Sequence, residues 1–194
     1  MLVAIDGPAG AGKSTVARAV ARALGFTYLD SGALYRAVAL SGARDPGALD
    51  IRFDGDRVLL DGRDVSDAIR TPEISLEASR RAADPAVRAA LLEHQRALIA
   101  HGDWVAEGRD IGTVVAPDAE VKVYLVADRE ERARRRTADR PGIGADALAT
   151  DLRVRDEKDA ERMKRADDAT EIDTTNSSID EVVEQIESLI RTAA

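Results

Sequence analysis

The residues best suited to chemistry lie close to the start of this chain. The segment Gly7-x-x-x-x-Gly12-Lys13-Ser14 fits the phosphate-loop pattern at every fixed position. Glycines let successive backbone N–H groups turn toward an anion, the lysine adds a positive charge, and the serine hydroxyl can bind a phosphate-associated Mg²⁺. We therefore expect this segment to bind a nucleoside triphosphate. The residues expected to contact it are Gly7, Pro8, Ala9, Gly10, Ala11, Gly12, Lys13, Ser14 and Thr15, with Ser14 also a metal ligand.

Arginines form a second group of chemically useful side chains. Phosphoryl transfer needs alignment and charge neutralisation more than covalent help from the protein. A site with arginines and no histidine base therefore suits transfer to a phosphate, because the acceptor oxygen is already ionised at pH 7. No Asn precedes position 176, which removes the Asn-Lys-x-Asp motif of a GTPase. The arginines in question are Arg36, Arg70, Arg109, Arg134, Arg135, Arg136, Arg155 and Arg162.

Short apolar strands must hold these residues in place. Residues 2–5 read as a buried strand, and the helix that follows has apolar residues at helical spacing from Val16 to Leu24. Residues 26–30 predict a second strand, with Ser31-Gly32 as the turn into a helix over 33–40. Further strands are expected at 104–107, 121–126 and 171–174. Strands that alternate with helices indicate an α/β fold with a parallel sheet, whose strand ends face the ligand.

The segments between these strands have a different character. Residues 51–53 and 57–60 predict a small hairpin, and helices are expected to open at Pro72 and to span residues 85–100. Basic helices are expected over 131–140 and 146–165, with a break at Pro141-Gly142-Ile143-Gly144 that looks like a lid tip. Ser178 caps a final amphipathic helix. We divide the chain into a core (residues 1–40, 101–130 and 166–194), an insertion (41–100) and a lid region (131–165).

Composition narrows the classes of function. The chain of 194 residues has a formal net charge of −8, which argues against a nucleic-acid partner. It has no cysteine and two histidines, so disulfides and thiolate or histidine-rich metal sites are not expected. No apolar run approaches the roughly 20 residues of a membrane span. We expect a cytoplasmic monomer that binds small molecules and no membrane.

Several motifs together make the chain similar to the bacterial cytidylate kinase family. They are residues 5–14 (IDGPAGAGKS), 29–36 (LDSGALYR), 64–66 (DVS), 69–71 (IRT), 107–115 (EGRDIGTVV), 155–159 (RDEKD) and 172–175 (IDTT). The resemblance runs from Val3 to Ile186. It implies a nucleoside-monophosphate kinase with a five-stranded parallel core, a small monophosphate-binding insertion and a helical lid. The implied reaction, a step of pyrimidine nucleotide metabolism, phosphorylates CMP or dCMP with ATP and Mg²⁺.

The resemblance also implies a role for individual residues. Arg36, Arg109 and Arg162 match positions that bind the acceptor phosphate, and Ser31 is expected beside them. Ser66, Arg70 and Asp110 match the base site, and Arg155 with Asp159 the ribose site. The segment from Arg132 to Arg136 lies where the family has lid arginines. The residues expected to act in catalysis are Lys13, Arg132, Arg136 and Asp110.

Two departures from the family pattern and two alternative functions stay open at this point. Residues 41–63 are shorter than the usual insertion, and residues 163–166 lack a Pro-Leu segment that usually precedes the last strand. The acceptor could be another small molecule, such as UMP, AMP or shikimate. Alternatively, the chain could be a nucleotide-binding regulator without kinase activity.

Overall fold

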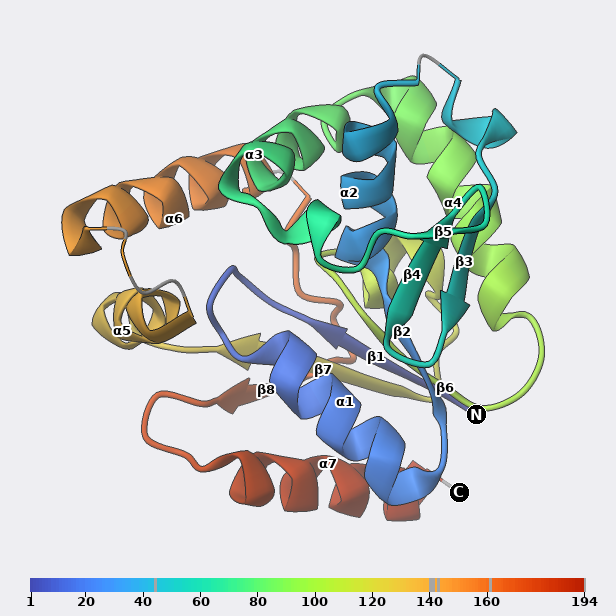
Figure 1. Cartoon of the computed structure of the whole chain (residues 1–194). Coiled ribbons are helices and arrows are strands. Elements are labelled where there is room, and N and C mark those ends of the chain that lie inside the picture. Colours follow the sequence, from blue (N-terminus) through green and yellow to red (C-terminus); the bar gives the residue numbers. More distant parts are fainter. Residues whose placement is uncertain (44, 140–141, 143, 161, 194) are drawn as a thin grey trace.

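Five parallel strands form the centre of the molecule. The structure is a computed structural model that describes residues 1–43, 45–139, 142, 144–160 and 162–193. The strands lie in the order β2-β6-β1-β7-β8, so the predicted five-stranded parallel sheet is confirmed. Figure 1 shows the strands crossing the molecule with helices on both faces. Their bounds are β1 (Leu2–Asp6), β2 (Thr27–Asp30), β6 (Trp104–Glu107), β7 (Val121–Val126) and β8 (Thr170–Asp173).

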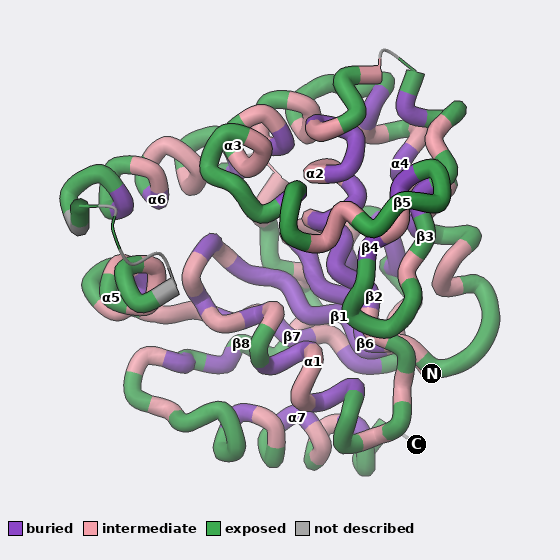
Figure 2. Tube along the Cα trace, in the orientation of Figure 1, coloured by how far each residue is buried: buried purple, intermediate pink, exposed green. Residues whose placement is uncertain are grey.

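The two faces of the sheet are covered by different helices. Side chains alternate along β1, so Val3 and Ile5 pack against α1 (Lys13–Leu24) and α7 (Ile179–Ala193), whereas Ala4 faces the other side. On that other side lie α4 (Pro85–Ile99) and a π-helical turn, η3 (Ile111–Val115). Figure 2 shows the resulting purple band of buried residues along the central strands. None of the helices in the described part of the chain is long and apolar enough to cross a membrane.

The insertion builds a second, smaller sheet on top of α2 (Ser31–Ser41). Its elements are η1 (Pro46–Ala48), β3 (Ile51–Asp54), β4 (Arg57–Leu60), β5 (Arg63–Asp64), η2 (Ala68–Arg70) and α3 (Pro72–Arg81), followed by α4. The predicted hairpin is confirmed, and β5 extends it to three antiparallel strands. Leu34 and Val38 of α2 share a buried cluster with Ile51, Ile69 and Leu91. The insertion is therefore anchored to the helix that leads away from the active-site end of β2.

The remaining helices, α5 (Arg129–Asp139) and α6 (Ala145–Asp159), pack together at the left of Figure 1. The predicted extension of the second helix to Arg165 is wrong. The backbone carbonyl of Asp159 accepts hydrogen bonds from the N–H groups of Arg162 and Met163, and the chain then runs irregularly to β8. Of the predicted break between these helices, Pro141 and Ile143 lie outside the described residues, while Gly142 lies in a turn and Gly144 precedes α6.

The prediction for the start of α2 is also corrected. Ser31 and Gly32 are its first helical residues rather than a connecting turn. The Asp30 carboxylate accepts a hydrogen bond from the N–H of Ala33 at 2.9 Å, so the last residue of β2 caps the helix directly. This cap places Ser31 and Arg36 at the carboxyl end of the sheet.

Candidate active site

The phosphate loop joins β1 to α1 along a path that excludes larger side chains. A Cβ on Gly7 would lie 2.2 Å from the carbonyl oxygen of Leu125 in β7, so only glycine allows the loop to leave β1 this closely. Gly12, at φ 89°, caps α1 in a left-handed conformation, and the first turn of α1 carries no acidic residue. The N–H groups and the dipole of α1 therefore meet an approaching anion without a competing carboxylate.

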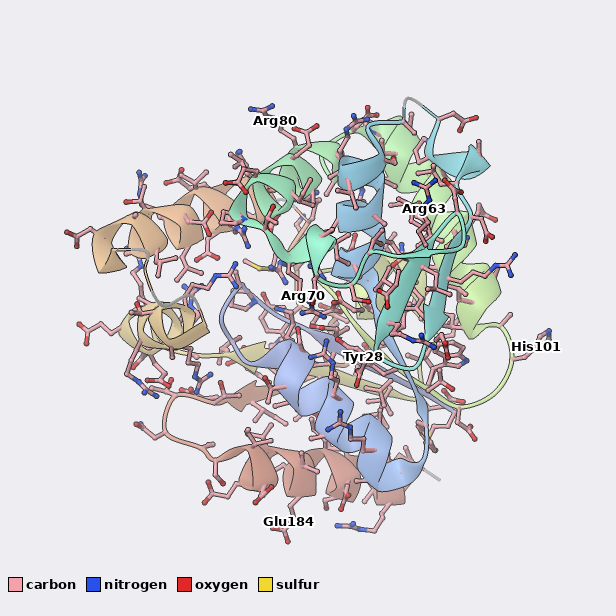
Figure 3. All side chains as sticks on the ribbon, in the orientation of Figure 1. Tyr28, Arg63, Arg70, Arg80, His101 and Glu184 are labelled. Carbon is pink, nitrogen blue, oxygen red and sulfur yellow. The ribbon has the colours of Figure 1, made fainter. Side chains whose placement is uncertain are left out.

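A cavity of about 580 Å³ opens between this loop and the insertion. Its floor includes Ala9, Gly10, Lys13, Ser14 and Thr15 from the loop and α1. In Figure 3, Arg70 lies between the insertion above and the loop with α1 below. The other predicted substrate and lid residues that line this cavity are Ser31, Arg36, Arg109, Asp110, Arg136, Arg155, Asp159 and Arg162.

Lys13 is buried beneath the loop. Its ammonium group donates a hydrogen bond to the carbonyl of Pro8 at 2.7 Å. Burial, together with the nearby Arg109 guanidinium, lowers the pKa of Lys13 to about 7. An anion in the loop would oppose both effects, so the lysine gains positive charge when phosphate arrives.

Carboxylates hold the arginines expected at the acceptor phosphate. Arg36 pairs with Asp30 at 2.7 Å, and Arg109 pairs through Nε with Asp159 at 2.9 Å. The second oxygen of Asp159 accepts a hydrogen bond from Arg162. Burial alone would raise the pKa of Asp30, but Arg36 and the N–H of Ala33 lower it below its usual value. The cap of α2 and one acceptor-side arginine therefore depend on the same charged carboxylate.

Ser31 lies close to this group of charges. A Cβ on Gly108 would come within 2.6 Å of the Ser31 hydroxyl, so the start of α2 and the turn after β6 meet at the cavity. Arg109 and Asp110 follow this glycine directly. The structure thus brings the predicted phosphate-site residues of two separate motifs together.

Two residues that the sequence motifs do not include lie in the wall of the cavity formed by α2, α3 and α4, which we call the far wall. Arg88 of α4 forms an ion pair with Asp110, and Ser79 of α3 lines the cavity beside them. The Ser79 hydroxyl is buried and has no hydrogen-bond partner among the described residues. Tyr35 also faces this wall. Arg88 and Ser79 lie within amphipathic helices and belong to none of the recognised motifs, so only the fold reveals their position.

The structure does not bring Ser66 or Arg132 to either of the described cavities. The Ser66 hydroxyl donates to Asp64 at 2.6 Å and accepts from the N–H of Val58 at 2.9 Å, so it shapes the turn after β5. The Arg132 guanidinium lies behind the phosphate loop, where it donates to the carbonyl of Ala9 at 3.1 Å and pairs with Asp156 at 2.8 Å. The predicted base contact of Ser66 and phosphoryl contact of Arg132 therefore have no support in this geometry.

Two buried carboxylates lie at the ends of the central strands. Glu107 ends β6, lines the cavity, and accepts a hydrogen bond from the Tyr28 hydroxyl at 2.6 Å. Asp6 ends β1 and accepts hydrogen bonds from the N–H groups of Ile111 and Gly112 at 2.9 and 2.8 Å. Burial raises the pKa of Asp6 to about 6, against the effect of these two N–H groups. Asp6 therefore anchors the turn that carries Arg109 and Asp110.

A second cavity, of about 710 Å³, also borders the phosphate loop. Residues 10–16 line it together with Arg134, Arg135 and Arg136 of α5 and the segment from Thr174 to Ser178. The two cavities share Gly10, Lys13, Ser14, Thr15 and Arg136. The loop and the start of α1 thus border two neighbouring cavities, each large enough for a ligand.

Comparison with known proteins gives the family. A sequence model described as cytidylate kinase matches residues 3–192. The chain belongs to the cytidylate kinase family. A cytidylate kinase of Pseudomonas aeruginosa (strain LESB58) is 46% identical over 212 aligned positions, which cover 95% of this chain and 93% of the relative. A cytidylate kinase of Carboxydothermus hydrogenoformans is 44% identical, covering 98% and 97%. As a member of this family the chain is a nucleotide kinase, a transferase.

The comparisons also show a difference in length within the family and a likeness to other kinases in fold. The Pseudomonas alignment has more positions than the 194 residues of this chain, so the relative contains residues that this chain lacks. Among solved structures, a shikimate kinase from Acinetobacter baumannii superposes with a TM-score of 0.53, 18% identity, and coverage of 98% of this chain and 93% of the other. That likeness shows a shared kinase fold and carries no information about the acceptor.

Proposed function

We propose that this enzyme transfers the γ-phosphoryl group of ATP to CMP or dCMP, giving ADP and CDP or dCDP. The observation that carries the proposal is the first cavity, which has a phosphate loop at one end and arginines with a base-sized polar wall at the other. The family match supports the same reaction. Acceptor and donor phosphates would meet above Lys13, between the two cavities.

The acceptor phosphate would be bound by Arg36, Arg109 and Arg162. Guanidinium groups match phosphate oxygens in bidentate geometry, and here their carboxylate partners already fix their orientation. Ser31 can add a hydroxyl donor. Arg155 and Asp159, which line the same cavity, are proposed to bind the ribose.

The cytosine ring would be recognised at the far wall. Cytosine presents an amino donor at N4 beside acceptors at N3 and O2, which a carboxylate and a guanidinium can satisfy. Asp110 and Arg88 provide this pair, and the unpartnered Ser79 hydroxyl can rotate to donate or accept. Arg70 lines the same space and remains a candidate contact. This set replaces Ser66, whose hydroxyl is bound within its own turn.

ATP would occupy the second cavity, with its phosphates in the loop. Residues 10–15 would bind the phosphates through backbone N–H groups, and the segment from Thr175 to Ser178 with α5 would enclose the nucleoside. The Ser14 hydroxyl and the Glu107 carboxylate fit Mg²⁺, because both line the first cavity beside Lys13 and are oxygen ligands. Bound there, Mg²⁺ would neutralise charge on the β and γ phosphates.

The residues then act on the reaction by position and charge. An oxygen of the CMP phosphate attacks the γ-phosphorus, a new P–O bond forms, and the bond to the bridging oxygen of ADP breaks. Lys13 stabilises the charge that develops between the β and γ phosphates, and Arg136, which borders both cavities, faces the transferring group. Because the acceptor is already ionised, no general base is needed.

A coupled assay of ADP release tests the function. The protein is incubated with ATP and Mg²⁺ alone and with each of CMP, dCMP, UMP, AMP and shikimate. ADP formation that depends on CMP or dCMP is the expected result. A preference for UMP, AMP or shikimate would overturn the assigned acceptor. A rate of ADP release that is the same with and without each acceptor, or no release at all, would instead favour a nucleotide-binding regulator.

Assembly and location follow from the proposed reaction and the charge of the chain. All the proposed contacts come from one chain, so a monomer suffices, and light scattering at assay concentration tests this. The net charge of −8 agrees with small nucleotides rather than nucleic acid as partners. The proposed substrates, ATP and CMP, support a cytoplasmic location.

A further inference from the structure

Two backbone carbonyl groups of the phosphate loop, those of Ala9 and Ala11, are held by side chains from outside the loop. The carbonyl of Ala9 accepts a hydrogen bond from Arg132 Nη1 at 3.1 Å, and the carbonyl of Ala11 accepts one from the Thr174 hydroxyl at 3.0 Å. Arg135 in turn donates to the Thr174 hydroxyl at 2.9 Å and to its carbonyl at 2.5 Å. Two arginines of α5 therefore reach the loop, one directly and one through a threonine.

The two carbonyls belong to the peptide groups that most need to be held. Each precedes a glycine with a positive φ, 80° at Gly10 and 89° at Gly12. Glycine has access to many backbone conformations, so these peptide groups can rotate more easily than others in the loop. In a planar trans peptide, the C=O and N–H groups point in opposite directions. A bond that fixes the carbonyl of Ala9 or Ala11 therefore fixes the N–H of the following glycine toward the opposite side, where phosphate binds.

The groups that supply these bonds are themselves buried and fixed. Thr174 is 3% exposed and Arg132 is 8% exposed. Asp156 of α6 pairs with Arg132, and the N–H of Thr174 donates to the carbonyl of Val126 in β7. Glu131 pairs with Arg135 from the preceding turn of α5. The contacts thus join the loop to α5, α6 and the ends of two core strands.

From these contacts we infer that Arg132 and Thr174 are positioning residues for ATP, which orient the N–H groups of Gly10 and Gly12 by binding the carbonyls of Ala9 and Ala11. We call this set of contacts the carbonyl clamp. The inference rests on the proposed use of the loop for ATP. It replaces the expected direct contact between Arg132 and the transferring phosphoryl group.

If the carbonyl clamp orients the loop, a variant that removes one of its contacts should lose affinity for ATP and retain its affinity for CMP. Thr174→Val retains the shape of the side chain but removes the hydroxyl, whereas Thr174→Ser retains the hydroxyl. We expect Thr174→Val to raise the dissociation constant for ATP, measured by calorimetry without acceptor, about tenfold. The constant for CMP should stay within twofold, and Thr174→Ser should restore ATP binding. Thr137→Val is the matched control, because that hydroxyl binds only the α5 backbone carbonyl of Ala133.

Arg132 provides an independent test at the peptide group between Ala9 and Gly10. Arg132→Met keeps the aliphatic stem and should also weaken ATP binding about tenfold, whereas Arg153→Met, which removes an exposed partner of Glu157 on α6, should not. Unchanged ATP affinity with reduced kcat in Arg132→Met would overturn the inference and return this residue to the phosphoryl group. Equal loss in Thr174→Val and Thr174→Ser, or a parallel loss of ATP and CMP binding, would show a purely structural role and also overturn it.

The wild-type protein separates failure of the clamp from failure of the proposed function. ATP binding is read without acceptor, so the variants can be compared even if CMP is not phosphorylated. Wild-type protein that phosphorylates CMP, combined with clamp variants that bind ATP normally, would overturn the clamp alone. Thermal unfolding of each variant, followed in the same buffer, confirms that the compared proteins are folded.

Discussion

The two ends of the active-site cavity prepare for phosphate in different ways. At the loop end the main donors are backbone N–H groups, whose directions are fixed by glycines and by the carbonyl clamp. At the acceptor end the donors are guanidinium groups, each held by a carboxylate of the protein. The first turn of α1 at the loop end carries no acidic residue, whereas the acceptor end already contains Asp30, Asp110 and Asp159.

This difference teaches how each end should respond to mutation. Guanidinium groups that are buried without a counter-ion are costly, so Asp30, Asp110 and Asp159 offset part of the positive charge at the acceptor end and keep its arginines oriented. An incoming phosphate must share or replace these partners. The loop end needs no such exchange, but it depends on one buried lysine whose charge is disfavoured until phosphate is present. The following predictions test the contrast from the largest expected effect to the smallest.

Removal of the Lys13 side chain should cause the largest loss of activity. Lys13→Ala should lower kcat by roughly two to three orders of magnitude, because charge that develops between the β and γ phosphates loses its stabilising partner. ATP binding should weaken much less, since the backbone donors remain. Steady-state kinetics at saturating ATP and CMP measure the effect. A variant that keeps half of the wild-type kcat would contradict this role.

Removing a shared carboxylate should affect mainly the acceptor end. Asp159→Asn would leave Arg109 and Arg162 without their common partner, so the KM for CMP should rise roughly 10- to 100-fold through loss of orientation. The KM for ATP should change less than twofold. Asp168→Asn, which removes an exposed partner of Lys122, is the matched control. Equal changes in both KM values would argue against two separately organised ends.

Base selectivity tests the far wall of the acceptor end. Uracil presents an acceptor where cytosine presents N4, so Asp110→Asn should narrow the CMP-to-UMP ratio of kcat/KM, mostly through loss of activity on CMP. A mismatch of this kind is worth roughly 1–3 kcal/mol by analogy with base recognition in nucleic acids. Ser79→Ala should lower activity on CMP, whereas Ser66→Ala should not. An unchanged ratio in Asp110→Asn would remove this residue from the base site.

The pH dependence of ATP binding gives the smallest expected effect and tests the role of Lys13 at the loop end. The pKa of Lys13 is lowered from 10.5 to about 7 in the free enzyme, so above pH 7 the lysine is largely neutral and must take up a proton when phosphate binds. ATP affinity should therefore fall as the pH rises above about 7. Calorimetry at pH 8 in buffers of different ionisation enthalpy should report an uptake of less than one proton. Identical enthalpies in all buffers would contradict this coupling.

The lowered pKa of Lys13 also makes the free energy of unfolding depend on pH in a defined direction. Because the folded-state pKa of Lys13 lies below its unfolded value, burial penalises the charged form. This penalty is absent above pH 10.5, grows as the pH falls from 10.5 to about 7, and is complete below that. Addition of ATP should thus raise the unfolding temperature of the enzyme more at pH 6.5 than at pH 9.

The sequence predicts the loop end better than the acceptor end for a physical reason. A backbone cradle needs glycines at fixed spacing, and these are visible as Gly7 and Gly12 in one short segment. The family motifs predict Arg36, Arg109 and Asp110, and each of these residues lies shortly after the end of a strand. Ser79 and Arg88 lie within helices that are separated in sequence from those strands, and only tertiary packing carries them to the cavity.

Local hydrogen bonding explains the other differences between the sequence-based expectations and the structure. Ser66 fits a motif, but its hydroxyl binds Asp64 two residues earlier, a contact that the motif does not reveal. The two-residue strand β5 is too short and exposed to show alternation of apolar residues. The end of α6 was placed too late because charge without apolar periodicity gives no boundary, whereas the bonds at Asp159 do.

Trp104, the first residue of β6, gives the enzyme a built-in optical reporter. It is the single tryptophan of the chain, and its indole N–H donates to the carbonyl of His101 at 2.8 Å. Glu107 at the cavity lies three residues further along the same strand, roughly 10 Å away at the usual rise per residue. Indole fluorescence therefore observes the amino end of the sheet, remote from bound nucleotide. Its emission should follow the melting of the core with little direct quenching by ligand, which lets folding be monitored in the presence of substrates that absorb in the ultraviolet.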